Sequence, residues 1–131
     1  MLSSFLCGIV ITLVNTGFEW LGAKWNIYYV QGKFPIINTP LLFFILWIFL
    51  TFFYLLGYEF LTKKKTEKIA YILGGIVLGW LFDWTMWKRG ILSLGENGTP
   101  LIIAFIWIIA VPLAVGIFSF FKNFFGKFIF D

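Results

Sequence analysis

Histidine is absent from this sequence of 131 residues, and cysteine occurs once, at Cys7. The lack of histidine excludes sites that bind zinc, copper or haem through histidine, and it also excludes the Ser-His-Asp and Cys-His catalytic groups. A single cysteine excludes a disulfide within the chain. We therefore expect neither a metal nor a cofactor. Any chemistry must come from carboxylates, lysines, aromatic rings or the groups of a partner.

Charged residues are also scarce, at 12% of the chain against 61% hydrophobic residues. A soluble domain carries about a quarter charged residues, and a chain this short has too little interior to bury so much apolar surface. Lipid accepts such a surface, so the composition is typical of an integral membrane protein. The net charge of +4 comes mainly from lysines at 63–68, between two apolar segments. A membrane-edge loop explains this cluster better than a nucleic-acid site, so we expect a bilayer and no nucleic acid as partner.

Four segments are long and apolar enough to span a membrane, which takes about 20 residues. They cover residues 2–21, 40–60, 69–87 and 100–121, and a short tail follows the last of them. We therefore predict an all-α integral membrane protein of four transmembrane helices, with residues 1–131 forming a single transmembrane domain.

Basic residues predict the orientation of the chain. With four spans, both termini lie on the same side as the loop 61–68. That side carries six of the ten lysines and arginines, and the dense cluster lies in its short loop. Because basic residues concentrate on the cytoplasmic side, we expect both termini in the cytoplasm, and the plasma membrane as the location.

An internal repeat relates the two halves of the sequence. The tripeptide Thr-Pro-Leu beginning at Thr39 recurs at Thr99, and a tryptophan follows each after the same interval. Upstream, Phe-Glu-Trp around Glu19 resembles Phe-Asp-Trp around Asp83, 64 positions later. Units 1–60 and 69–121 would then be two tandem helical hairpins related by a pseudo-twofold axis along the membrane normal. The alternative is coincidence, because Thr-Pro is a common helix start and tryptophan is abundant here.

Small and polar residues form a stripe at helical spacing on the first and third segments. The first stripe comprises Ser4, Gly8, Thr12, Asn15, Glu19 and Gly22, and the second comprises Gly75, Gly79 and Asp83. Small residues let helices approach closely, so we expect both stripes to face the interior of the bundle. Glu19 and Asp83 would then lie at similar depth, near the outer side.

Glu19 and Asp83 are the candidate catalytic residues, because an acid inside a membrane is costly and usually functional. The alternative is a structural role, in which they are hydrated near the interface or paired with a basic neighbour such as Lys24, Lys88 or Arg89. For Glu59 we favour a surface pair with Lys63, one helical turn away.

An acid pair enclosed by aromatic rings can carry out a specific kind of chemistry. A carboxyl group in apolar surroundings can protonate an alkene, and aromatic faces stabilise the resulting carbocation. A second carboxylate then removes a proton or activates water. This chemistry suits an isoprenoid or another lipid delivered from the bilayer. The candidate substrate-binding residues are Asn15, Trp20, Tyr28, Tyr29, Trp80 and Trp84.

The segment beginning at Glu19 resembles the membrane carotenoid-biosynthesis family that includes the carotenoid hydratases. That family has a Glu-x-x-Gly motif, a Gly/Tyr-rich loop, a Pro-Leu helix start and a Trp. The matching residues here are Glu19, Gly22, Tyr28, Tyr29, Pro40, Leu41 and Trp47. The resemblance implies acidic roles for Glu19 and Asp83 and pocket roles for the two tyrosines. Members of that family are longer, have more spans and carry a glycine before the tyrosines, which this chain lacks.

Three functions remain open from the sequence. The first is a membrane enzyme, or half of one, acting on an isoprenoid or other lipid by carboxylate acid–base chemistry. The second is a non-catalytic accessory subunit of a larger membrane complex. The third is a small oligomeric transporter coupled to protons or cations. All three lead us to expect a homo- or hetero-oligomer, and the first predicts a hydrophobic ligand.

Overall fold

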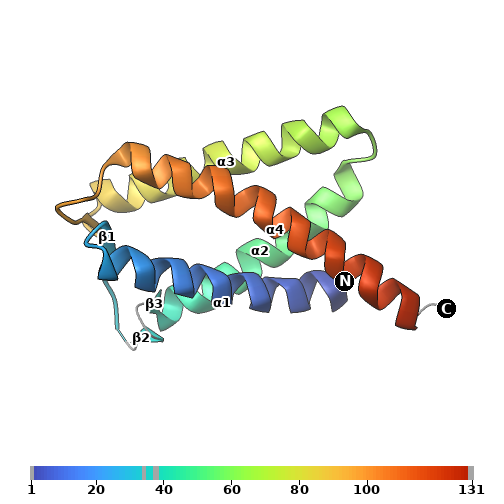
Figure 1. The fold of residues 1–131 in the computed structure, drawn as a ribbon, viewed down its shortest axis with the longest axis horizontal. Helices are drawn as coiled ribbons and strands as arrows, with labels where there is room; N and C mark the ends of the chain where they lie inside the picture. Colours follow the sequence, from blue (N-terminus) through green and yellow to red (C-terminus); the bar gives the residue numbers. More distant parts are fainter. Residues whose placement is uncertain (1, 34, 37–38, 130–131) are drawn as a thin grey trace.

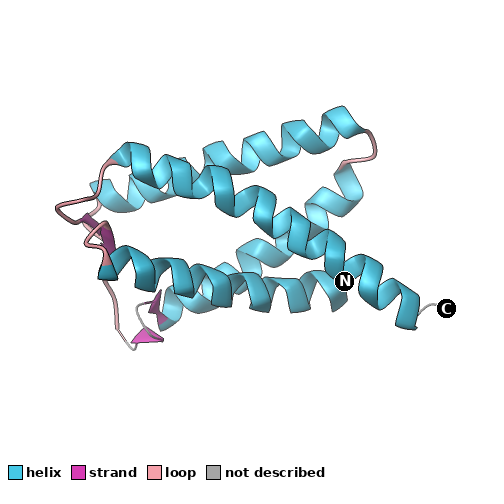
Figure 2. Ribbon diagram, in the orientation of Figure 1, coloured by secondary structure: helices cyan, strands magenta, loops and turns pink. Residues whose placement is uncertain are grey.

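Four long helices make up most of the computed structural model, which describes residues 2–33, 35–36 and 39–129 (Figures 1 and 2). The helices are α1 (Leu2–Lys24), α2 (Leu41–Leu61), α3 (Lys65–Lys88) and α4 (Pro100–Ile129). Each contains a stretch long and apolar enough to cross a membrane. The predicted class, an all-α membrane protein of four helices, is confirmed. The remaining residues of the predicted domain 1–131 lie outside the described part.

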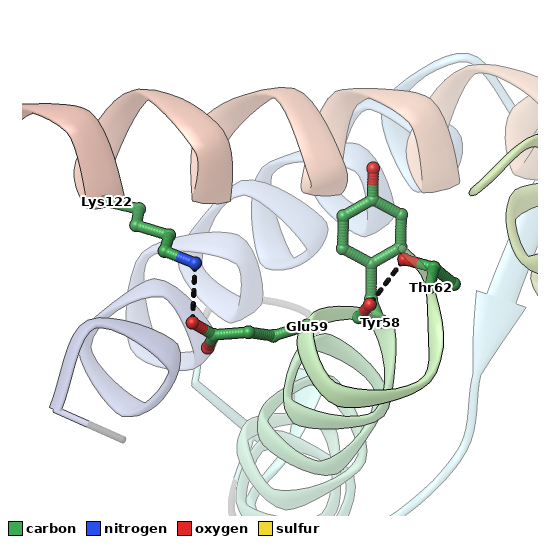
Figure 3. A network of polar contacts seen from close by, with 4 residues as sticks. All are labelled: Tyr58, Glu59, Thr62 and Lys122. Atoms are coloured by element: carbon green, nitrogen blue, oxygen red, sulfur yellow. Dashed lines mark hydrogen bonds and ion pairs between the residues drawn. The ribbon is translucent and has the colours of Figure 1, made fainter. Parts of the chain in front are cut away.

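The last helix is longer than predicted. Helix α4 continues through residues 122–129, where the sequence predicted a short tail. No proline occurs after Pro112, and Lys122 finds a partner on α2: its Nζ lies 2.6 Å from Glu59 Oε1 (Figure 3). The expected pair of Glu59 with Lys63 is therefore wrong. A contact between helices replaces the one predicted along a single helix.

Short strands occupy the connections that the sequence predicted only as loops. Strand β1 (Tyr28–Val30) pairs antiparallel with β4 (Leu92–Leu94), and β2 (Pro35–Ile36) pairs with β3 (Thr39–Pro40). The β1–β4 ribbon joins the α1–α2 connection to the α3–α4 connection. We call this end of the bundle the ribbon end. The opposite end, with both termini and the α2–α3 loop, is the loop end (Figure 1).

The ribbon is centred on two residues that are equivalent in the sequence repeat. Its central pair is Tyr29 with Ser93, which are 64 positions apart. The flanking backbone bonds follow the same offset: Gln31 N donates to Ile91 O at 2.9 Å, and Gly95 N donates to Ile27 O at 2.8 Å. Each bond becomes the other when the two halves are exchanged. This register is the one that a twofold relation between two hairpins requires.

The C-terminal ends of α1 and α3 also match at this offset. Asn26 and Gly90 both have positive φ, 55° and 74°. Ammonium groups lie 5.0 Å from the centre of a tryptophan ring in both helices, in the pairs Lys24–Trp20 and Lys88–Trp84. The helix starts differ, however. Thr99 Oγ1 accepts a hydrogen bond from Ile102 N at 3.3 Å, as a helix cap does. Thr39 holds the equivalent position in the Thr-Pro-Leu repeat but makes no such bond, because Pro40 is the capping residue of α2.

Helix packing departs from twofold symmetry on one side of the bundle. Helix α1 packs closely on α2 and α4, and α3 packs on α4, whereas α2 and α3 contact each other much less than the equivalent pair, α4 and α1. Close approach between α1 and α2 depends on Gly8, where an added Cβ would lie 2.9 Å from Ile48 O. The stripe on α1 faces inward as predicted, since Ser4, Thr12 and Glu19 are buried. The looser contact between α2 and α3 leaves room inside the bundle.

Candidate functional site

A cavity of about 590 Å³ lies between the four helices. Its walls are mostly apolar side chains, and it runs from Trp47 and Trp107 on the ribbon side to Tyr54 and Gly75 on the side of the loop end. Its volume falls in the range of small-molecule sites, about 300–1,000 Å³. The shape and lining suit an apolar ligand.

A second, smaller pocket of about 30 Å³ contains both candidate acids. Glu19 and Asp83 line it together with Tyr28 of the ribbon. Asn15, Trp47, Trp107 and Ala110 line both spaces. The acid pocket therefore adjoins the ribbon side of the apolar cavity, and its volume is enough for one water molecule.

Glu19 is held by two hydrogen-bond donors. Only 6% of the residue is exposed. Asn15, one turn earlier on α1, donates from Nδ2 to Oε1 at 3.2 Å. The hydroxyl of Thr39, on β3, donates to Oε2. Both carboxylate oxygens are thus occupied by neutral donors, which fix the orientation of the side chain.

Asp83 has one donor, and it comes from the facing helix. Trp107 Nε1 donates to Asp83 Oδ2 at 2.6 Å. The indole of Trp107 lies against Gly79, where any added Cβ would overlap the ring. The glycine at position 79 therefore makes room for the tryptophan that orients the acid. Oδ1 of Asp83 has no protein partner among the described residues, so it is the carboxyl oxygen best placed to meet a ligand.

The structure does not pair either acid with a basic side chain within the described ranges. The ammonium groups of Lys24 and Lys88 lie over tryptophan rings instead. The one ion pair between described residues joins Lys122 to Glu59, on the side of the loop end. The interpretation of Glu19 and Asp83 as partners of Lys24, Lys88 or Arg89 is therefore wrong.

Tyr28 adds a third polar group to the acid pocket. It is 7% exposed, and its ring covers Gly22 of α1, where a Cβ would collide with it. Burial raises the pKa of the Tyr28 phenol far above its usual range, and the two nearby carboxyl groups raise it further. The phenol therefore remains neutral and can donate a hydrogen bond to a ligand or to water.

The predicted binding residues fall into two groups. Asn15 and Tyr28 line the acid pocket, and Asn15 also lines the cavity. Four others lie outside both linings: Trp20, Tyr29, Trp80 and Trp84. Trp20 and Tyr29 are 44% and 42% exposed, which suits residues at a membrane interface. Trp80 donates to Pro100 O at 3.3 Å and packs beside Trp84.

Sequence reasoning missed three residues of the site. Trp47 and Trp107 form the boundary between cavity and acid pocket, with ring centres 5.6 Å apart. They are the tryptophans that the repeat aligns, so their equivalence was a usable signal. Thr39 stood out only as the start of the Thr-Pro-Leu repeat, and its bond to Glu19 is visible only in the tertiary structure. No cluster of three potential metal ligands occurs among the described residues.

No protein-family model, curated protein or solved structure matches this chain.

Proposed function

We propose that this chain is a membrane-embedded enzyme that acts on an isoprenoid or similar lipid by carboxylate acid–base chemistry. The observation that carries the proposal is the contact between an apolar cavity of about 590 Å³ and a pocket that holds two acids. An apolar ligand in the cavity, lying against Trp47 and Trp107, has its end beside the carboxyl groups. The resemblance of the Glu19 segment to the carotenoid hydratases supports the same chemistry.

The hydrogen bonds favour different roles for the two acids. Asp83 accepts one bond and keeps Oδ1 unpartnered by described residues, so it serves as the proton donor. Glu19 accepts a bond at each oxygen, and these bonds hold its carboxyl group at a fixed place beside the pocket, so we assign it the role of proton acceptor. Asp83 transfers its proton to one alkene carbon, and a carbocation forms on the other. The faces of Trp47 and Trp107 stabilise this positive charge.

Two outcomes of the carbocation fit the site. A water molecule in the acid pocket can add to the cation while Glu19 accepts the proton it loses, which completes a hydration. Otherwise Glu19 removes a proton from an adjacent carbon, and the double bond moves. In both cases one proton leaves Asp83 and one arrives at Glu19, so the lipid gains either a water molecule or no mass. Return of the proton through solvent restores the enzyme.

The cavity favours an enzyme over a proton or cation transporter. Between the acid pocket and the side of the loop end its lining is apolar apart from Thr12, Thr51 and Tyr54. Ions would need a continuous polar path, whereas a hydrocarbon needs only an apolar one. The accessory-subunit alternative does not require a cavity beside the acids.

The test is lipid analysis of an isoprenoid-producing bacterial host that expresses the protein. We expect a lipid that gains one water, or an isomer with a displaced double bond, in cells with the wild-type chain. Asp83→Asn and Glu19→Gln should each reduce the product about 100-fold or more, the scale of a lost general acid or base. Glu96→Gln, an exposed carboxylate in the connection after β4, is the control and should keep full activity.

A wild-type product level in both acid variants, at equal protein level, would overturn the enzyme proposal. It would also remove proton coupling through these residues, and the accessory-subunit function would then fit better.

A further inference from the structure

The loop-end side of the cavity is bounded by a tyrosine that rests on a glycine. Tyr54 of α2 and Gly75 of α3 both line the cavity. A Cβ added at Gly75 would overlap the ring and hydroxyl of Tyr54. The missing side chain at position 75 thus lets the Tyr54 ring reach across to α3. Beyond it lies a packed cluster of Cys7, Leu55 and Phe118, which closes the bundle toward the loop end.

Reciprocal hydrogen bonds hold the Tyr54 ring in this position. The Tyr54 hydroxyl donates to Tyr71 O at 3.1 Å, and the Tyr71 hydroxyl donates to Tyr54 O at 3.1 Å. The two ring centres are 4.9 Å apart. Two side chains that bond to each other's backbone have little freedom to move aside. Tyr54 is therefore a firm end to the cavity.

The side of the cavity between α2 and α3 faces the bilayer. Its two most exposed lining residues are Phe53 and Leu78, 63% and 67% exposed, one on each of these helices. Aromatic contacts bridge the two helices above and below: Trp47 with Phe82 at 5.6 Å and Tyr54 with Tyr71 at 4.9 Å. These two aromatic pairs bound the opening at its two ends, and lipid chains can enter it laterally from the bilayer, between α2 and α3.

We propose that the site binds a single isoprenoid chain that enters between α2 and α3, and that Tyr54 sets the length of chain it accepts. This inference rests on the proposed function, because the acids fix where the reacting end lies. Gly75 and Phe82 are separated by about 10 Å along α3 at 1.5 Å per residue. When the double bond of the isoprenoid lies beside Trp47 and Trp107, the rest of the chain has only about this length of cavity before it meets the Tyr54 ring.

Native mass spectrometry of the purified protein, released from detergent after incubation with prenyl alcohols, tests the proposal. The probes are the all-trans alcohols of ten, fifteen and twenty carbons in equal amounts. The wild-type chain should retain one of the shorter alcohols best. Tyr54→Ala should shift the ratio toward the next longer alcohol by about tenfold, the scale of relieving a steric overlap in a packed interior. Tyr54→Leu serves the same purpose if the alanine variant does not fold.

Two controls distinguish a change in the preferred chain length from a general loss of packing in the protein. Tyr54→Phe loses the bond to Tyr71 O but keeps the ring that lies against Gly75. It should therefore still prefer the shorter alcohol, with a shift far smaller than that of Tyr54→Ala. Tyr58→Ala removes a ring one turn further along α2, which contacts the same Tyr71 but lies outside the cavity lining. It should leave the preference unchanged.

Three results would overturn the inference. The first is an unchanged ratio of longer to shorter alcohol in Tyr54→Ala and Tyr54→Leu when both variants fold. The others are a shift in Tyr58→Ala as large as that in Tyr54→Ala, and retention of phospholipid alone. The proposed function fails separately. If the ratio shifts at Tyr54 but the acid variants still form the lipid product at the wild-type level, the chain site stands and the acid–base mechanism falls.

Discussion

Gly79 shows how one missing side chain serves the site. Its Cα faces Trp107, and that tryptophan holds Asp83 through a 2.6 Å hydrogen bond. Gly79→Ala should force the indole aside and reduce the free energy of unfolding by about 1–3 kcal/mol, the usual cost of overpacking. It should also lower the yield of lipid product, because Asp83 loses its partner. Unfolding of the detergent-solubilised protein in SDS measures the first effect.

Gly74→Ala is the matched control for this prediction, because a Cβ there meets no atom within 4 Å. Alanine is a better helix former than glycine by about 1 kcal/mol, so this variant should be as stable as the wild type or more stable. A destabilisation of equal size at both positions would contradict the prediction, because it would show that the loss at Gly79 does not come from overlap with the Trp107 ring.

The sequence indicates site residues only where the residue type itself is unusual for its surroundings. Glu19, Asp83 and Asn15 stand out in an apolar sequence, and the pocket role of Tyr28 was predicted through the resemblance of its segment to the carotenoid-biosynthesis family. The stripes on α1 and α3 face inward because small residues gather where helices meet. Thr39 could not be found, because its bond to Glu19 joins residues 20 positions apart through β3. Trp20, Trp84 and Trp47 have the same side chain, so residue type alone cannot tell which of them lines the cavity. Only their positions on the packed helices place Trp47 in the cavity wall and the other two outside it.

At the scale of the elements, the ends of α1 and α3 support the proposal that the two hairpins are related. Both helices end in the same backbone bond: Ile27 N donates to Gly22 O at 2.8 Å, and Ile91 N donates to Met86 O at 3.0 Å. Between them the chain turns through a left-handed residue, Asn26 or Gly90. These are the two residue types that tolerate that conformation best.

A substitution at Gly90 tests this equivalence. Gly90→Ala should reduce the free energy of unfolding by about 1–2 kcal/mol, the cost of a Cβ in the left-handed region. No other effect is expected, since a Cβ there meets no atom within 4 Å. Gly90→Asn should cost clearly less, because Asn26 occupies the same conformation in the first half. Equal losses in the two variants, measured by unfolding in SDS, would contradict the proposed match of the two turns.

The helices could be predicted from the sequence, whereas the ribbon could not. Each helix is marked by a continuous apolar run, and Thr99-Pro100 marks the start of α4. The strands are two or three residues long, and they form only because two connections far apart in sequence meet at the ribbon end. The same holds for the end of α4, whose contact with α2 through Lys122 and Glu59 depends on the packing of the bundle.

At the scale of the whole molecule, the orientation in the membrane decides from which side water and protons reach the acid pocket. The acids lie toward the ribbon end, and the lysine cluster lies at the loop end, at residues 63–68. Basic loops stay on the cytoplasmic side, so we propose that the ribbon end faces outward across the plasma membrane. Water and protons would then exchange with the pocket from the outside.

Cysteine labelling in whole cells tests this orientation. Cys7 is fully buried, and Cys7→Ala gives a background without thiols. In that background Asn97→Cys, at the ribbon end, should react with a membrane-impermeant maleimide added outside. Lys64→Cys, in the α2–α3 loop, should react only after the cells are permeabilised. Both positions are exposed, so a difference between them reports the side of the membrane and not burial. Labelling of Lys64→Cys in intact cells, with Asn97→Cys protected, would reverse the orientation and open the acid pocket toward the cytoplasm.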